Sequence, residues 1–188
     1  MRLLSQAWLA LGLLIVTPLA SAEDFGVANW GQNAMAVRDL EQRPNLTPLT
    51  ERDYLIYEAS LPGIHRTRLI YQFEDGRLET GRFIFSVAPG SPTSTWLDQF
   101  ETVRALITQQ YGEPAQQQVL QPAGSANNPP DNWSDALQRD AIILKTQWRT
   151  DQTLITQQLA WNGSRPHHQI IYLPANGVDL SDLGASPF

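Results

Sequence analysis

The chain has 188 residues, is 42% hydrophobic and contains six Trp, which is enough apolar material for a folded domain and excludes global disorder. Its formal net charge of −6 disfavours nucleic acids and anionic membrane surfaces as partners, because both attract positively charged proteins. The sequence contains no cysteine, which excludes disulfides, thiol nucleophiles, thiolate metal sites and a lipid attached through cysteine.

Residues 1–22 have the pattern of a secretory signal peptide. An arginine follows the initiating methionine, and an apolar stretch then continues until Pro18. Small residues at Ala20 and Ala22 suit cleavage by a signal peptidase. The apolar stretch is too short, and too soon followed by that cleavage site, for a membrane span. We therefore expect cleavage near Ala22 and a mature protein in the periplasm or outside the cell.

The first half of the mature chain predicts a helix followed by three strands. Residues 25–30 favour a short opening strand, and Asn33 is a suitable N-cap for a helix that runs to about residue 42. The helix has a narrow apolar stripe, made by Ala36, Val37 and Leu40. Alternating apolar residues then predict strands at 54–61, 65–73 and 78–87.

The dipeptide Asp75-Gly76 predicts a hairpin between the last two of these strands. A two-residue loop pairs odd with even positions, whereas a three-residue loop, residues 74–76, pairs odd with odd. The three-residue loop is favoured because it alone gathers the apolar residues on one face, namely Leu69, Tyr71, Phe73, Phe83, Phe85 and Val87. In this register Gly81 lies opposite Leu69, and Arg68 lies opposite Arg82.

The second half begins with the clearest helical pattern, at residues 96–111, with Ser94 or Thr95 as its cap. Its apolar stripe is expected to cover the aromatic sheet face and consists of Trp96, Phe100, Val103 and Ile107. Residues 115–132 lack periodicity and predict a solvated loop, followed by a short helix near 133–139. Three final strands are predicted near 142–148, 155–161 and 169–173, with Gln169, Ile171 and Leu173 on one side of the last.

This order of elements predicts an α+β fold, with antiparallel sheet packed by two helices. The chain is expected to form a single domain, residues 23–176, with a polar, fraying tail at 177–188. The order also allows two α-β-β-β repeats, with halves at 23–90 and 91–176. Residue-level identity between the halves is lacking, so internal duplication and a non-repetitive domain both stay open.

A framework of core and turn residues extends over about residues 25–173. It contains Tyr71-x-Phe73-x-x-Gly76-x-Leu78, Tyr111-Gly112-x-Pro114 and Trp148. This framework resembles that of uncharacterised secreted bacterial proteins. The order of elements resembles the small periplasmic domains of BamE-type outer-membrane assembly lipoproteins and the tandem arrangement of β-lactamase-inhibitor proteins. The resemblance implies a fold more than a function, and the missing lipid-attachment cysteine departs from the BamE pattern.

Motifs for covalent or cofactor catalysis are missing from the sequence, including Gly-x-Ser-x-Gly, Ser-x-x-Lys, phosphate-binding loops, dinucleotide fingerprints and calcium loops. Acidic pairs such as Asp98/Glu101 and Glu74/Asp75 are interpreted as solvated charge. The sequence therefore nominates no catalytic residue, no cofactor and no metal ligand, and an enzyme is the less favoured class.

The histidines do not form an obvious site. His167 and His168 are adjacent at the start of a strand, so their side chains point to opposite faces and do not share a metal ion. A solvated strand entry beside Pro166 is the favoured interpretation of this pair. His65 is interpreted as a capping or edge residue.

Four residues are nominated for an interaction site: Arg66, Arg68, Arg82 and Trp133. The three arginines fall on the even-numbered face of the hairpin, where they form either an exposed charge network with Glu58 or Glu79 or a recognition patch for an acidic partner. Trp133 either contacts a partner or folds back over a sheet edge.

These observations favour an exported, non-catalytic module that binds an envelope protein or peptide. Two other classes stay open. A small periplasmic hydrolase requires a pocket with convergent polar residues of shifted pKa. A secreted inhibitor requires a protruding loop, such as 115–132, beside a large aromatic sheet face.

Overall fold

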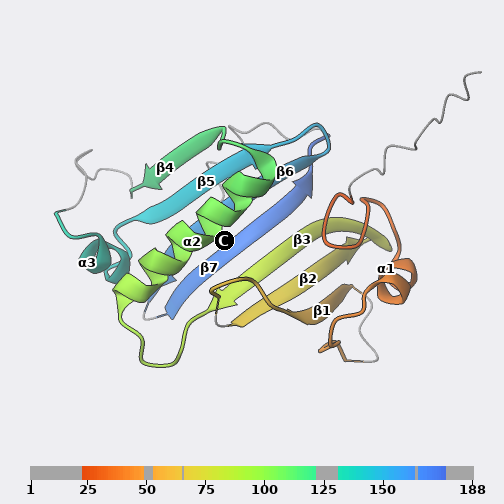
Figure 1. Cartoon of the computed structure of the whole chain (residues 1–188), viewed down its shortest axis with the longest axis horizontal. Coiled ribbons are helices and arrows are strands. Elements are labelled where there is room, and N and C mark those ends of the chain that lie inside the picture. Colours follow the sequence, from red (N-terminus) through yellow and green to blue (C-terminus); the bar gives the residue numbers. More distant parts are fainter. Residues whose placement is uncertain (1–22, 49–52, 65, 122–130, 164, 177–188) are drawn as a thin grey trace, which may run out of the picture.

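The computed structural model of the protein describes residues 23–48, 53–64, 66–121, 131–163 and 165–176, so the predicted leader and tail lie outside the described residues. The helices are α1 (Ala34–Leu40), α2 (Thr93–Tyr111) and α3 (Trp133–Gln138) (Figure 1). The strands are β1 (Tyr54–Ala59), β2 (Arg66–Glu74), β3 (Arg77–Ser86), β4 (Gln116–Leu120), β5 (Ile143–Arg149), β6 (Thr153–Asn162) and β7 (Arg165–Pro174). The predicted α+β class is confirmed.

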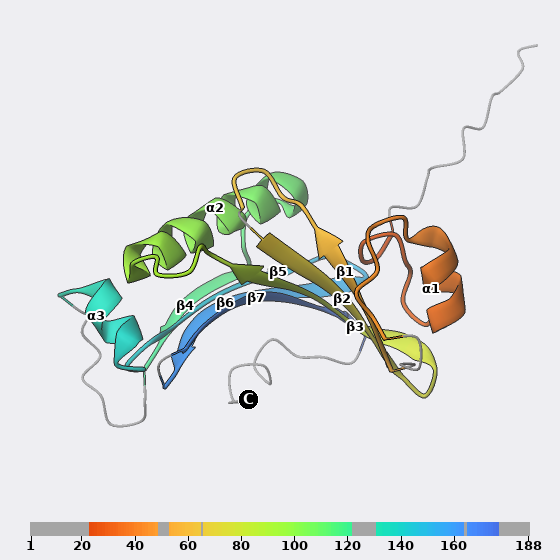
Figure 2. The ribbon, with the colours of Figure 1, turned by 90° about the horizontal axis from the view of Figure 1, so that it is seen from below.

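All of these strands belong to one antiparallel sheet with the order β1-β2-β3-β7-β6-β5-β4. Two three-stranded meanders meet where β3 pairs with β7. Helix α2 lies across one face of the sheet (Figure 2), and α1 and the N-terminal segment contribute to the core on the same side. We call this side the helix face and the other side the opposite face. Two α-β-β-β units joined edge to edge would give the order β1-β2-β3-β7-β6-β5, and β4 is an additional strand beside β5 that such a repeat does not account for. Internal duplication stays a prediction.

The apolar residues of the hairpin between β2 and β3 lie on one face, as predicted. This register is set by a bulge within the strand and not by the predicted three-residue loop. Asp75 and Gly76 form a two-residue turn, and both have positive φ, at 50° and 75°. This conformation is typical of a type I′ turn. The register then shifts between Gln72 and Phe73, where a bulge restores the pairing of odd with odd positions.

The predicted pairs within that hairpin are therefore wrong by two residues. Leu69 lies opposite Phe83, and Gly81 lies opposite Tyr71. The extra residue is accommodated inside the strand and not in the loop, and sequence alternation cannot distinguish these two positions.

Several expectations for the second half also needed correction. Helix α2 begins at Thr93, directly after Pro92, which precedes either predicted cap. The predicted solvated loop contains strand β4, which pairs with β5. On β7 the buried side chains are His168, Ile170 and Tyr172, which is the opposite set from the one expected. The short helix near Trp133 and the end of α2 at Gly112 are confirmed.

The N-terminal segment inserts an aromatic side chain into the sheet instead of forming the predicted opening strand. Phe25 and Ala28 exchange backbone hydrogen bonds of 3.0 and 2.9 Å, which makes a tight turn. The ring of Phe25 is 2% exposed and lies over Gly81, where an added Cβ would be only 2.3 Å from it. Gly81 therefore provides the space that this ring occupies.

Helix α1 is capped as predicted, because the side chain of Asn33 accepts a hydrogen bond from the Ala36 amide at 2.9 Å. Only Val37 of its predicted stripe is buried, whereas Leu40 is half-exposed. The helix therefore contributes little to the core and positions the chain that follows it.

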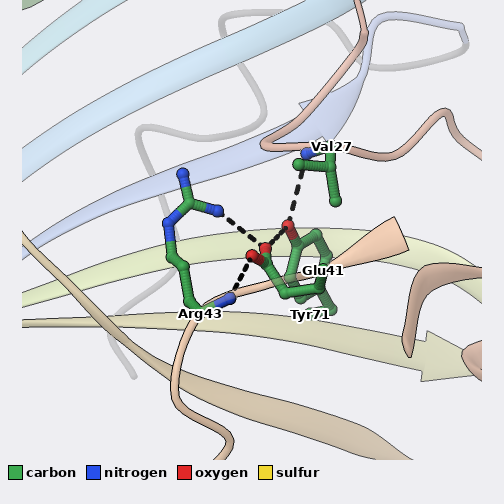
Figure 3. A network of polar contacts seen from close by, with 4 residues as sticks. All are labelled: Val27, Glu41, Arg43 and Tyr71. Atoms are coloured by element: carbon green, nitrogen blue, oxygen red, sulfur yellow. Dashed lines mark hydrogen bonds and ion pairs between the residues drawn. The ribbon is translucent and has the colours of Figure 1, made fainter. Parts of the chain in front are cut away.

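A buried polar network fixes that following chain to the sheet (Figure 3). The Tyr71 hydroxyl donates to Glu41 at 2.7 Å and accepts from the Val27 amide at 3.3 Å. Arg43 reaches the same carboxylate at 2.7 Å, and its own amide also donates to Glu41, at 3.1 Å. Burial, together with the bond to Glu41, raises the pKa of Tyr71 above its usual value. The network therefore connects three separate segments through one carboxylate.

We expect Tyr71→Phe to reduce the free energy of unfolding by about 2 kcal/mol, because the buried Glu41 carboxylate would lose a hydrogen-bond donor. Tyr57→Phe is a matched control, since Tyr57 is also buried but its hydroxyl has no hydrogen-bond partner among the described residues. Urea unfolding followed by tryptophan fluorescence measures both variants. Equal destabilisation by the two substitutions would contradict a stabilising role for the network.

Candidate functional site

The three nominated arginines lie on the opposite face of the sheet. Arg68 is opposite Glu58 on β1 and Ile84 on β3, while Arg82 is opposite Ile70. The predicted direct juxtaposition of Arg68 and Arg82 is therefore wrong, because the bulge moves them to diagonal positions. Opposite charges face each other across β1 and β2, which favours a charge network on this part of the surface.

The arginines also line separate hollows. Arg66 and Arg68 border one of about 360 Å³ beside Glu58, whereas Arg82 borders another, of about 350 Å³, beside Ile70 and Ile84. The Nε atom of Arg82 is buried and makes no hydrogen bond within the described residues. Recognition of an acidic partner by these arginines stays a prediction.

The double variant Arg68→Gln/Arg82→Gln tests that prediction. We expect it to weaken capture of an acidic partner from an envelope extract while changing the free energy of unfolding by less than about 0.5 kcal/mol. Quantitative pull-down with wild-type and variant protein measures the first effect, and urea unfolding measures the second. Unchanged capture would leave these arginines as a solvated charge network.

Trp133 lies on the helix face, apart from the arginines. It is the first residue of α3, whose N-cap Asn132 accepts a hydrogen bond from the Asp135 amide at 3.2 Å. The next turn of this helix buries Ala136 and Leu137 in a cluster with Phe100 and Trp161. The indole of Trp133 itself is 38% exposed. The short helix is thus anchored by its apolar side and presents the tryptophan at the surface.

Trp133 borders a groove of about 410 Å³ between α2 and β4. Helix α2 contributes Leu97, Glu101 and Arg104, while β4 contributes Gln117 and Val119. The groove also contacts Phe100 and Leu144, which belong to the buried cluster beneath it. Polar residues also line the groove, including Gln118, Lys145 and Thr146 on β4 and β5. A concave site of this volume that combines apolar surface with polar groups is in the range of sites that bind small ligands or side chains.

One arginine connects the two walls of this groove. Arg104 donates to the Gln117 side chain at 2.8 Å and forms an ion pair with Glu101, one turn earlier on α2. The pairing neutralises most of the charge at this side of the groove. Val119, next to Gln117 on the same face of β4, is 41% exposed. Lys145 also lines the groove, and burial lowers its pKa. The groove therefore combines apolar surface with an ion pair and a lysine.

His168 is buried under α2, so its interpretation as part of a solvated strand entry is wrong. Gln99 donates to the Ser86 carbonyl at 3.0 Å, which leaves its side-chain oxygen to accept from His168 Nδ1 at 2.8 Å. Gln157 donates to the Phe100 carbonyl at 2.7 Å, and its amide nitrogen lies 3.1 Å from His168 Nε2. Both glutamines therefore suit a neutral imidazole that is protonated at Nδ1.

Burial lowers the pKa of His168 to about 3. The ring also packs against Phe85 and Phe100, at centroid distances of 4.6 and 5.6 Å. His168 does not line the groove beside Trp133 or either of the hollows beside the arginines. The residue is thus a packed, hydrogen-bonded core histidine that is only 1% exposed.

The remaining sequence candidates do not converge. His167 is exposed, and His65 lies outside the described residues. Within the described ranges, no three side chains of His, Asp or Glu are grouped as metal ligands would be, and no helix is long and apolar enough to cross a membrane. Glu101 of the pair Asp98/Glu101 is engaged by Arg104.

The residues that β4 contributes to the groove are not predictable as a strand wall, because their sequence favours a loop. Gln116–Leu120 contains three consecutive glutamines and only two apolar residues, so its alternation is weak. Arg104 and Glu101 have the spacing of an ordinary surface ion pair on a helix. Of the residues that line the groove, Trp133 alone is predicted from the sequence as an interaction residue, because it lies outside any apolar stripe.

Searches of protein-family models, curated proteins and solved structures found no match to this chain. The candidate site therefore rests on the geometry of the groove.

Proposed function

We propose that the protein is an exported binding module that holds a segment of another polypeptide in the groove between α2 and β4. The observation that carries this proposal is the half-exposed Trp133 beside a partly apolar groove of about 410 Å³. Tryptophan is enriched among residues that dominate binding energy, especially where it borders a pocket. The signal-peptide pattern at residues 1–22 supports export, and it favours a partner in the envelope or outside the cell.

The apolar part of the groove favours apolar side chains as ligands. Leu97, Val119 and Trp133 offer apolar contact, and Arg104 is already engaged by Glu101 and Gln117. A strongly charged ligand would have to compete with these pairs. A polypeptide segment offers apolar side chains together with backbone groups that can use the polar atoms at the rim.

The proposal is tested by screening an array of heptapeptides for binding to the purified protein. Fluorescence anisotropy then measures the dissociation constants of the peptides that bind. We expect Trp133→Ala to weaken binding by about thirtyfold, which corresponds to about 2 kcal/mol for loss of a central tryptophan. The variant should remain folded, because the side chain is half-exposed.

Met35→Ala is the matched control, since Met35 is 73% exposed and lies on α1, far along the sheet from α3 (Figure 1). It should leave the dissociation constants unchanged. The proposal would be overturned if Trp133→Ala had no effect, or if Arg68→Gln/Arg82→Gln abolished binding instead. In the second case the arginine hollows would be the binding surface.

A further inference from the structure

The outer strands of the sheet differ in how their edges are covered. Strand β1 is flanked by residues 44–47 of the same chain. The Leu46 amide donates to the Ile56 carbonyl at 2.8 Å, and the Glu58 amide donates to the Pro44 carbonyl at 3.0 Å. Thr47 adds a side-chain contact to Ile56. An extended segment therefore already covers this edge, although it is too irregular to form an eighth strand.

Strand β4 is the outer strand at the other end of the sheet. It pairs with β5 along one side, and no described strand lies along its outer side. Its residues, Gln116–Leu120, include no charged residue and no proline. Soluble proteins usually protect exposed edges with charges, proline, bulges or a covering segment. Within the described residues β4 has none of these protections, which favours an edge that accepts a partner.

The groove lies on the helix face of this same strand. Gln117 and Val119 are opposite Thr146 and Leu144 in register, and all four border the groove. Side chains alternate between the faces of a strand, so every second residue of a strand added beside β4 would also point to the helix face. Such side chains would lie beside Val119 and within reach of Trp133.

We propose that β4 accepts an extended segment of a partner polypeptide as an additional strand, with alternate apolar side chains entering the groove between α2 and β4. This inference rests on the proposed function and specifies its mode. Backbone hydrogen bonds along β4 would supply affinity, and the groove would supply selectivity for the side chains. Five residues of β4 offer an edge about 17 Å long, enough for a short peptide segment.

A second copy of the chain fits this edge less well. Its own β4 would offer mainly glutamines, with Val119 as the single apolar residue on the helix face. Two copies would also bring together chains that each carry a net charge of −6. A different polypeptide with regularly alternating apolar residues can form backbone hydrogen bonds along β4 and also place apolar side chains in the groove.

Hydrogen exchange on the purified protein tests this mode of binding. The probes are acetylated, amidated heptapeptides in which threonine alternates with leucine, valine or phenylalanine. At saturating concentrations we expect exchange of the outward-facing amides of β4 to slow by at least tenfold. Versions of the same peptides with N-methyl groups on alternate residues should bind at least tenfold more weakly, because they lack donors for the edge.

The outcomes separate the mode from the function. Binding that depends on Trp133, but leaves β4 exchange unchanged and tolerates N-methylation, would overturn strand addition and preserve the groove as a binding site. Absence of binding by every peptide at millimolar concentration would overturn both. If the β4 amides exchanged slowly without any peptide, and sedimentation showed a dimer, the edge would be occupied by a second copy of the chain. That result would overturn the inference.

Discussion

Lowering the pH from 7.5 to 4.5 is expected to remove about 3 kcal/mol of stability through His168 alone. In the unfolded chain a histidine has its usual pKa near ~6.5, whereas in the folded protein burial lowers the pKa of His168 to about 3. Between these values the unfolded chain binds one more proton than the folded protein. Stability from this residue is therefore complete above the upper value and is lost as the pH falls toward the lower one.

The measurement compares urea unfolding of wild type and His168→Gln at several pH values between 7.5 and 4.5. The variant should be less stable at pH 7.5, because it loses ring packing against Phe85 and Phe100. Its stability should nevertheless fall less steeply with acidification, and the difference between the two slopes isolates His168 from the carboxylates.

His167→Gln is the matched control, because His167 is the adjacent residue and is exposed. It should retain the pH profile of wild type. Parallel profiles for wild type and His168→Gln would show that the buried ring does not contribute to acid sensitivity.

Gly81→Ala is expected to destabilise the protein by about 3 kcal/mol, which is large for the addition of one methyl group. The reason is steric, since the new Cβ would lie 2.3 Å from the ring of Phe25. That ring is closely surrounded by Tyr71, Phe83 and Tyr172, at centroid distances of 5.2, 5.6 and 4.9 Å. It therefore has little room to move away.

A double-mutant cycle separates this clash from a general loss of sheet stability. Phe25→Ala alone should cost about 3–5 kcal/mol, because it removes a fully buried ring. Gly81→Ala combined with Phe25→Ala should cost clearly less than the sum of the two single variants. Ser86→Ala, at an exposed position of the same strand, is the control and should stay within about 0.5 kcal/mol of wild type. Additive effects of Gly81→Ala and Phe25→Ala would contradict the steric explanation.

The parts of the fold that could be predicted share a regular pattern with a strong physical cause. Phe100, Val103 and Ile107 repeat with the period of a helix and are all buried where α2 meets the sheet. On β1, Leu55, Tyr57 and Ala59 alternate and are likewise buried. In both elements the buried side chains repeat with the period of the backbone, which is about 3.6 residues in a helix and two in a strand.

The errors occur where that pattern is absent or ambiguous. The bulge beside Gln72 changes the register without changing which residues share a face, so alternation is equally compatible with both pairings. On β7 the buried face includes a histidine, His168. The two aliphatic residues Ile171 and Leu173 lie on the other face, so polarity predicts the wrong face as buried.

The candidate groove was less predictable than the fold, because its residues are contributed by separate elements. Arg104 and Gln117 are 13 positions apart and meet only because α2 crosses the sheet beside β4. Trp133 could be nominated from the sequence, but its neighbours on α2 could not. Sequence spacing predicts contacts within one helix or one strand and gives little information on contacts between elements.

Local periodicity and turn chemistry are enough to predict the class of fold, the α2 stripe, the apolar face of the first meander and the position of the Asp75-Gly76 turn. Three features follow only from the tertiary structure: Phe25 occupies the space above Gly81, two glutamines enclose the buried His168, and β4 forms the outer edge beside a groove. Each of these features depends on contacts between segments far apart in the chain. Such contacts do not produce a repeating pattern in the sequence, so they cannot be predicted from it.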